Sequence, residues 1–154
     1  MIHEHQGNLL HRERGILVHG CNAQGIMGAG IARVIKERHP TVFAAYRMRK
    51  ESGGLHLGDI IPVEVDSATP PKIIISAITQ EQFGSDWNVI YVSYDAIEAC
   101  FTKIRALAIE LALPVHFPLI GCGLANGKWE EVGPRIDHAL GDDVEKHLWM
   151  LHAA

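Results

Sequence analysis

Short apolar runs alternate with amphipathic stripes along the chain, and the two periods predict its strands and helices. Compact apolar runs rich in β-branched residues predict strands. Such runs lie at 15–18, 60–65, 72–78, 115–120 and 144–151, and a weaker pattern occupies 1–10. Apolar residues three and four positions apart predict helices. The expected helices are one that carries Ile31, Val34 and Ile35, one over 40–50 with proline in its first turn, one from the N-cap Ser93 to Leu111, and one beginning near Trp129.

Strands that alternate with helices predict an α/β fold. Such a pattern is typical of a three-layer α/β/α sandwich with a mixed or largely parallel central sheet. The run at 72–78 is suited to a strand buried on both faces, and Pro62 predicts an edge position or a bulge for 60–65. At 154 residues with 47% hydrophobic content, we expect residues 1–154 to form a single domain.

Glycine-rich loops follow two of the predicted strands. The first carries glycines at 25, 28 and 30 after Asn22, and the second spans 121–127. A strand–loop–helix junction exposes backbone N–H groups that can hold an anion, although the glycines alternatively only permit a tight turn. Neither loop has a Walker A or dinucleotide fingerprint. If the two strands are neighbours, both loops lie at one edge of the sheet, where the pair suits a diphosphate.

Net charge bears on the kind of partner, and one polar loop carries two aromatic residues. A net charge of -4 with neutral histidines argues against a broad nucleic-acid interface. The run from Arg47 to Lys50 is a local basic patch or, alternatively, a solvated helix end. In the polar loop 79–88, Phe83 and Trp87 are expected to plug the sheet edge, with a lid as the alternative.

The cysteines, the N-terminal histidines and the N-terminal sequence indicate whether the protein binds a metal and where in the cell it lies. Three cysteines without metal-ligand spacing predict neither a disulfide framework nor a zinc site. His3 and His5 would share one face of an edge strand, but no third ligand is marked, so no metal and no other cofactor is expected. The N-terminus lacks a basic and apolar leader, and the apolar runs are too short to cross a membrane. A cytoplasmic protein without a membrane partner is therefore expected.

Two segments carry a resemblance to a known family. HGCNAQGIMGAGIA at 19–32 and PLIGCGLANGKWEEV at 118–132, in that order and around that spacing, resemble the macro domain, an ADP-ribose-binding α/β/α module. The likeness covers nearly the whole chain. It is greatest to the subfamily that contains ADP-ribose 1″-phosphate phosphatases and terminal ADP-ribose hydrolases.

The resemblance implies a set of ligand-binding residues. Asn8 and Leu9 would lie at the adenine, where Asn8 replaces the Asp that many macro domains place there and retains an acceptor oxygen. Asn22 would face the distal ribose, with a local turn bond as its alternative role. The two diphosphate loops would consist of Gly28, Ala29, Gly30 and Ile31 and of Gly121, Cys122, Gly123 and Leu124.

At some positions where related hydrolases carry catalytic residues, this sequence has other residues, which limits the mechanisms that the resemblance implies. The lysine and aspartate used by terminal hydrolases are matched by Gln80 and Ala125, which disfavours covalent chemistry through a lysine. His19 stands where the phosphatase group has a histidine, so His19 and Asn22 are the candidate catalytic residues. The alternative for His19 is a structural, hydrogen-bonded role. Strand alternation also places the two residues on opposite faces unless the backbone bends at Gly20.

The resemblance thus implies a protein that binds ADP-ribose or a derivative. Hydrolysis of ADP-ribose 1″-phosphate is the leading expectation for its activity. The alternatives are hydrolysis of an ADP-ribosyl ester or nucleic-acid adduct, with modified protein or nucleic acid as partner, and a reader of ADP-ribose without catalytic activity.

Overall fold

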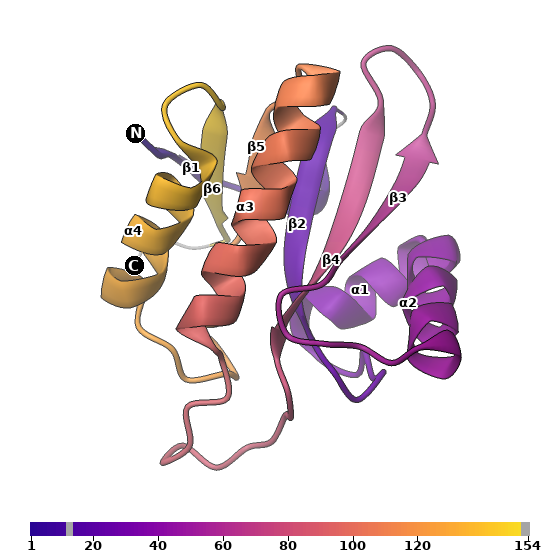
Figure 1. Ribbon diagram of the computed structural model, residues 1–154, viewed down its shortest axis with the longest axis vertical. Coiled ribbons are helices and arrows are strands. Elements are labelled where there is room, and N and C mark those ends of the chain that lie inside the picture. Colours follow the sequence, from indigo (N-terminus) through magenta and orange to yellow (C-terminus); the bar gives the residue numbers. More distant parts are fainter. Residues whose placement is uncertain (12–13, 152–154) are drawn as a thin grey trace.

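The computed structural model describes residues 1–11 and 14–151. Six strands and four α-helices are interspersed along this part of the chain, as the hydrophobic pattern predicts (Figure 1). The strands are β1 (His3–Gln6), β2 (Gly15–Asn22), β3 (Ile60–Asp66), β4 (Lys72–Gln80), β5 (Val115–Phe117) and β6 (Lys146–Met150). The helices are the short 3-10 turn η1 (Leu9–His11) and the α-helices α1 (Gly30–Arg38), α2 (Pro40–Ser52), α3 (Tyr94–Leu111) and α4 (Trp129–Leu140).

The strands form one mixed sheet in the order β1-β6-β5-β2-β4-β3. β3 is antiparallel to β4, and every other neighbouring pair is parallel. β2 and β5 are neighbours, so the condition for bringing the two glycine loops together is met. Pro62 lies in the edge strand β3, as predicted, because an edge strand does not need the missing N–H on its open side.

Helices cover both faces of the sheet, which confirms the three-layer α/β/α architecture (Figure 1). Side chains of β2 alternate between the two layers. Ile16 and Val18 pack into the core beneath α3 and α4, whereas Leu17 and Cys21 pack against α1 and α2. The face toward which a side chain points therefore decides which pair of helices it contacts.

Local signals account for the helix boundaries. Ser93 is the N-cap of α3, where its Oγ accepts the backbone N–H of Ala96 at 3.1 Å, as expected. Pro40 is the first residue of α2, where its missing N–H is not needed. His39 separates α1 from α2, and its backbone N–H caps α1 through the carbonyl of Ile35.

Several strand ends differ from the prediction. β2 continues to Asn22, beyond the apolar run, because its polar end still pairs with β4 and reaches Gln80 across a register shift. β5 ends at Phe117, before Pro118, rather than at Ile120. β6 spans Lys146–Met150, inside the predicted range. The elements themselves are placed as the sequence indicates.

Candidate functional site

A cleft of about 520 Å³ lies at the carboxyl edge of the sheet. Its volume is in the range of pockets that hold a nucleotide-sized ligand. Residues from three loops line it, those that follow β2, β4 and β5. They are Gly20, Cys21, Asn22, Ile26, Gly28, Ala29, Gly30, Ile31, Ala32, Gln80, Phe83, Gly84, Ser85, Pro118, Leu119, Ile120, Gly121, Gly123, Leu124 and Ala125. The structure thus brings both predicted glycine loops to one cavity.

Asn22 organises the first loop from its base. Its Oδ1 accepts the backbone N–H of Gln24 at 3.0 Å and that of Ile26 at 3.4 Å, while its Nδ2 donates to the carbonyl of Ile26 at 2.8 Å. The Tyr46 hydroxyl from α2 lies 3.0 Å from the same Oδ1. These are the local turn bonds that the sequence left as an alternative, and they coexist with a position in the cleft wall.

The start of α1 forms part of the cleft wall. Gly28, Ala29, Gly30 and Ile31 all line it, and Ala29 caps the helix without a side-chain hydrogen bond. The first N–H groups of an α-helix have no partner within the helix, and the helix dipole is positive at this end. Gly30 adopts a φ of +59°, and nothing lies within 4 Å of where its Cβ would be. This end of α1 can therefore receive an anion.

The glycines of the second loop have two different roles. A Cβ on Gly121 would lie 2.5 Å from Val92 Cγ2, and one on Gly127 would lie 2.5 Å from the Gly121 carbonyl oxygen. These two glycines are required by packing. Gly123 has no atom within 4 Å of a Cβ and faces the cleft with Leu124. Cys122 does not line the cleft, and its Sγ instead contacts the Ile120 carbonyl at 3.4 Å.

Asn8 and Leu9 do not line this cleft. Asn8 immediately precedes η1, and its Oδ1 accepts the backbone N–H of Leu10 at 2.9 Å. Leu9 is buried in the core between the sheet and the α1–α2 layer. Their assignment to the adenine stays a prediction, since both side chains already have structural partners.

His19 is a core residue and is not among the residues that line the cleft, so its assignment as a catalytic residue stays a prediction. Its side chain is fully buried, and Nε2 lies 2.8 Å from the Ser76 Oγ on the neighbouring strand. Burial lowers the pKa of His19 from 6.5 to about 4, so its ring is neutral near pH 7. Strand alternation places His19 on the same face as Leu17 and Cys21, toward the α1–α2 layer. The structural alternative fits these contacts.

The cleft wall contains no charged side chain among the residues that the structure describes. Its polar side chains are Asn22, Gln80 and Ser85, and its one thiol is Cys21. Burial raises the pKa of the Cys21 thiol to about 12, so it is protonated at neutral pH and is a poor nucleophile. Gln80 and Ala125, which the family resemblance matches to the lysine and aspartate of terminal hydrolases, both lie in the wall. Lysine-centred chemistry therefore has no residue at the expected place.

A third loop also forms part of the wall, within the segment 79–88 whose aromatic residues the sequence left as a plug or a lid. Phe83, Gly84 and Ser85 of the β4–α3 connection line the cleft. Asn126 fixes this loop, because its Nδ2 donates to the carbonyls of Asp86 at 3.0 Å and Val89 at 2.7 Å. The expectation that the loop aromatics plug the sheet edge is wrong. Trp87 is 81% exposed and Phe83 50% exposed, so neither is buried against the sheet.

The histidines of β1 belong to an aromatic cluster with β6. His5 Nε2 lies 2.8 Å from His147 Nδ1, and the His5 ring stacks on Trp149. Within residues 1–11 and 14–151, no group of three or more His, Cys, Asp or Glu side chains is arranged to hold a metal ion. No helix in this part of the chain is long and apolar enough to span a bilayer.

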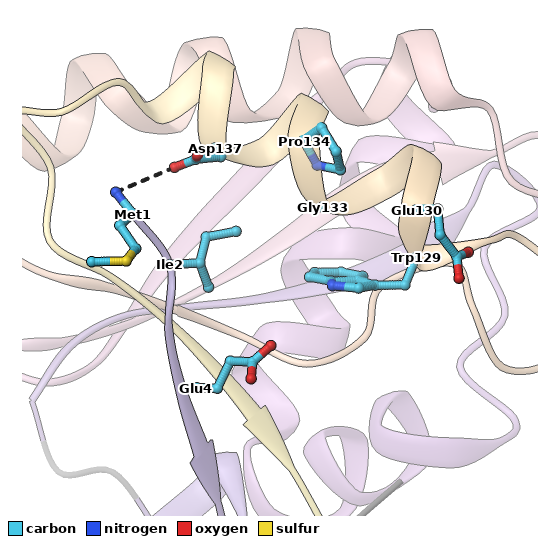
Figure 2. A pocket seen from close by; sticks show the side chains of 8 residues that line it. All are labelled: Met1, Ile2, Glu4, Trp129, Glu130, Gly133, Pro134 and Asp137. Carbon is cyan, nitrogen blue, oxygen red and sulfur yellow. Dashed lines mark ion pairs between the residues drawn. The ribbon is translucent and has the colours of Figure 1, made fainter.

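A second hollow of about 480 Å³ lies between β1 and α4 (Figure 2). Ile2 and Trp129 form its apolar part, and the carboxylates of Glu4 and Glu130 lie at its rim. Asp137 is already paired with the buried Lys146 and with the amino group of Met1. None of the predicted ligand residues lines this hollow, so the cleft at the carboxyl edge is the candidate site.

The profile of the macro domain family matches residues 18–136, which include both glycine loops. The chain belongs to the macro domain family.

Two curated relatives illustrate the range of activities in similar proteins. The chain is 31% identical over 140 residues to a DNA ADP-ribosyl glycohydrolase of Mycobacterium tuberculosis, a match that covers 91% of this chain and 39% of that protein. It is 25% identical to an ADP-ribose 1″-phosphate phosphatase of Scheffersomyces stipitis, over 75% of this chain and 78% of that protein. The chain therefore spans well under half the length of the glycohydrolase.

Solved structures share the fold over nearly the whole chain. The macrodomain of Thermus aquaticus DarG superposes with a TM-score of 0.81 at 26% identity, covering 97% of this chain and 98% of that one. A Bacteroides thetaiotaomicron protein of unknown function superposes with a TM-score of 0.84 at 25% identity, over 97% of each chain. Thermosipho africanus DarTG in complex with ADP-ribose, at 18% identity and a TM-score of 0.77, shares the fold over 96% of this chain and 41% of its own.

Proposed function

We propose that this chain binds ADP-ribose across the two glycine loops and hydrolyses ADP-ribose 1″-phosphate. The observation that carries the proposal is the meeting of the β2–α1 and β5–α4 loops in one cleft whose wall has no charged side chain. Backbone N–H groups from two loops suit the two phosphates of a diphosphate. The apolar side chains Ile26, Phe83 and Leu124 suit the ribose and base faces that accompany it.

A neutral wall is compatible with phosphoryl transfer. This reaction depends mainly on positioning and on stabilising charge on the phosphoryl oxygens, and it does not require a protein nucleophile. In the proposed reaction, water attacks phosphorus, the bond from phosphorus to the 1″ oxygen breaks, and ADP-ribose and inorganic phosphate are released. Loop N–H groups would stabilise the phosphoryl charge.

Gln80 is the side chain best placed to orient the attacking water. It is the last residue of β4 and lies in the cleft wall. Its Nε2 donates to the Gln82 carbonyl at 2.8 Å, which fixes the amide plane. Among the described residues, none donates to its Oε1, so this oxygen can accept a hydrogen bond from water. A glutamine performs this task in some phosphoryl-transfer enzymes.

Phosphate release tests the proposed reaction. The purified chain and its Gly123→Val variant are incubated with ADP-ribose 1″-phosphate, and inorganic phosphate and ADP-ribose are quantified together. Equal amounts of both products from the unmutated chain, and at least a 10-fold lower rate from the variant, are expected. Binding of ADP-ribose without phosphate release would leave the ligand assignment and reject the phosphatase activity.

A second candidate is removal of ADP-ribose from DNA. The observation that favours it is the 31% identity to the DNA ADP-ribosyl glycohydrolase over 91% of this chain. Incubating the chain with an oligonucleotide that carries one ADP-ribosyl group and measuring its mass separates the two candidates. Loss of the ADP-ribosyl mass, without phosphate release from ADP-ribose 1″-phosphate, would select this second activity.

A further inference from the structure

The loop between β2 and α1 rests on two basic residues of the next helix, α2. Lys50 Nζ donates to the Ala23 carbonyl at 3.1 Å, and Arg47 NH1 donates to the Gly25 carbonyl at 3.2 Å. Both contacts connect positions more than twenty residues apart in the sequence. The basic patch that the sequence shows at Arg47 to Lys50 is thus only partly a solvated helix end.

The loop and α2 are in close contact at Gly25. This glycine has a φ of +86°, and a Cβ added to it would lie 2.5 Å from Arg47 NH1 and 3.2 Å from Lys50 Cγ. Gly25 itself is buried. The positive φ favours glycine at this position, and the loop backbone here lies close to both basic side chains.

Other backbone groups of this loop are held by hydrogen bonds at its base. Asn22 binds the N–H of Gln24 and both backbone groups of Ile26, and Ala23 N–H donates to the Gln80 carbonyl at 2.9 Å. Carbonyl oxygens turned toward an anion would repel it. Holding the Ala23 and Gly25 carbonyls against α2 keeps them directed toward the cations rather than the cleft.

We propose that Arg47 and Lys50 are positioning residues for the anionic part of the ligand, a diphosphate held by the β2–α1 loop. They orient the loop through two carbonyls and place two positive charges behind it, and neither lines the cleft. Lys50 forms no ion pair within the described part of the chain, so its charge is not neutralised locally, whereas Arg47 pairs with Glu51 at 3.3 Å. Lys50 accordingly makes the larger contribution. This inference rests on the proposed function.

Arg49 provides a matched control within the same helix turn. It pairs with Asp59 at 3.8 Å and contacts neither Ala23 nor Gly25. A general effect of positive charge at the end of α2, such as compensation of the helix dipole, would be lost equally in Arg49→Met and Lys50→Met. An effect transmitted through the loop would be lost only in Lys50→Met.

The inference is tested by calorimetric titration of ADP-ribose into the unmutated chain and three variants, Lys50→Met, Lys50→Arg and Arg49→Met. Thermal midpoints are measured on the same preparations. Lys50→Met is expected to weaken binding about 3- to 10-fold, the scale of a partly exposed charge that also orients a backbone group, and to reduce the salt dependence of the affinity. Lys50→Arg restores most of the affinity, and Arg49→Met binds like the unmutated chain.

Two results would overturn the inference. Equal affinities for Lys50→Met and Arg49→Met, with the unmutated chain binding ADP-ribose, would reject a role for Lys50 while leaving the proposed function in place. No binding of ADP-ribose by the folded unmutated chain would reject the proposed function and the inference together.

Discussion

The hydroxyl of Tyr46 lies within hydrogen-bond distance of both oxygens of Asn22, the backbone carbonyl and the side-chain Oδ1. Tyr46 is fully buried in α2, and Asn22 ends β2 at the base of the first loop. One phenol therefore connects the helix layer to the residue that orders the loop backbone. Burial raises the pKa of the Tyr46 phenol further above its usual range, so the group stays a donor across the physiological range.

Replacing Tyr46 with phenylalanine removes that donor and keeps the ring. We expect Tyr46→Phe to lower the free energy of unfolding by about 1 kcal/mol, the usual net value of one buried hydrogen bond. Because Asn22 then loses its support from α2, ADP-ribose affinity is expected to fall as well. Chemical denaturation and calorimetry on one preparation measure both. A destabilised protein with unchanged affinity would show that Tyr46 supports the core and not the loop.

The glycines of the second loop allow ligand binding to be separated from folding. Gly123→Val is expected to keep the thermal midpoint, since a Cβ there meets no atom within 4 Å. Gly121→Val is expected to lower the midpoint strongly, because its side chain would collide with Val92 and its φ is +75°. Gly53→Ala, at the open end of α2, is the control for glycine replacement as such. A Gly123→Val protein that melts as early as Gly121→Val would contradict this division.

His19 is expected to contribute to stability rather than to turnover. His19→Ala leaves Ser76 Oγ without its 2.8 Å partner and removes packing, which should cost roughly 1 to 3 kcal/mol of unfolding free energy. Turnover per folded molecule should be unchanged, because the ring does not reach the cleft. Phosphate release corrected for the folded fraction provides the check. A loss of about 100-fold in that corrected rate would restore His19 to the mechanism.

The lowered pKa of His19 also gives stability a defined pH dependence. Because the folded pKa is about 4 and the ordinary value is 6.5, the unfolded chain takes up a proton first as the pH falls. The contribution of neutral His19 to the free energy of unfolding is fully present above pH 6.5. It declines between pH 6.5 and about 4, by a total of about 3 kcal/mol. Comparing denaturation curves of the unmutated chain and His19→Asn across this window isolates the effect. Parallel curves for the two proteins would rule it out.

The fold could be predicted from the hydrophobic pattern because the apolar run at 72–78 and the stripe from Ser93 to Leu111 each have one clear period. The two glycine loops were also evident, since glycines after an apolar run mark a strand–loop–helix junction. The end of β2 at Asn22 could not be predicted, because the last residues of this strand are polar and are held in the sheet by pairing with β4.

Other parts of the site could not be predicted because they depend on tertiary contacts. Nothing in the local sequence of Phe83 to Ser85 indicates that Asn126, about forty residues away, fixes that loop in the cleft wall. The contacts of Arg47 and Lys50 with the first loop likewise arise only when α2 packs beside it. His19 is the converse case. The family resemblance implied a catalytic role for it, whereas the structure buries its ring beside Ser76 of β4.

Two residues of the cleft wall, Gln80 and Ala125, predict that the chain does not use covalent catalysis by a lysine. With Gln80 and Ala125 in the wall, release of ADP-ribose from glutamate-modified protein should be slow and should pass through no lysine adduct. Borohydride reduction during the reaction, followed by mass spectrometry of the intact chain, detects such an adduct. A stable ADP-ribosyl mass on any lysine would show that a lysine outside the described wall reaches the ligand.

Calorimetric titration of ADP-ribose, with AMP in parallel, into the unmutated chain and Gly123→Val tests the central claim most directly. We predict that the unmutated chain binds ADP-ribose saturably and more tightly than AMP. We also predict that Gly123→Val, with an unchanged thermal midpoint, binds ADP-ribose at least 10-fold more weakly. Equal affinity of the two folded proteins for ADP-ribose would place the ligand away from the loops, and no binding to either would contradict the claim that this cleft is an ADP-ribose site.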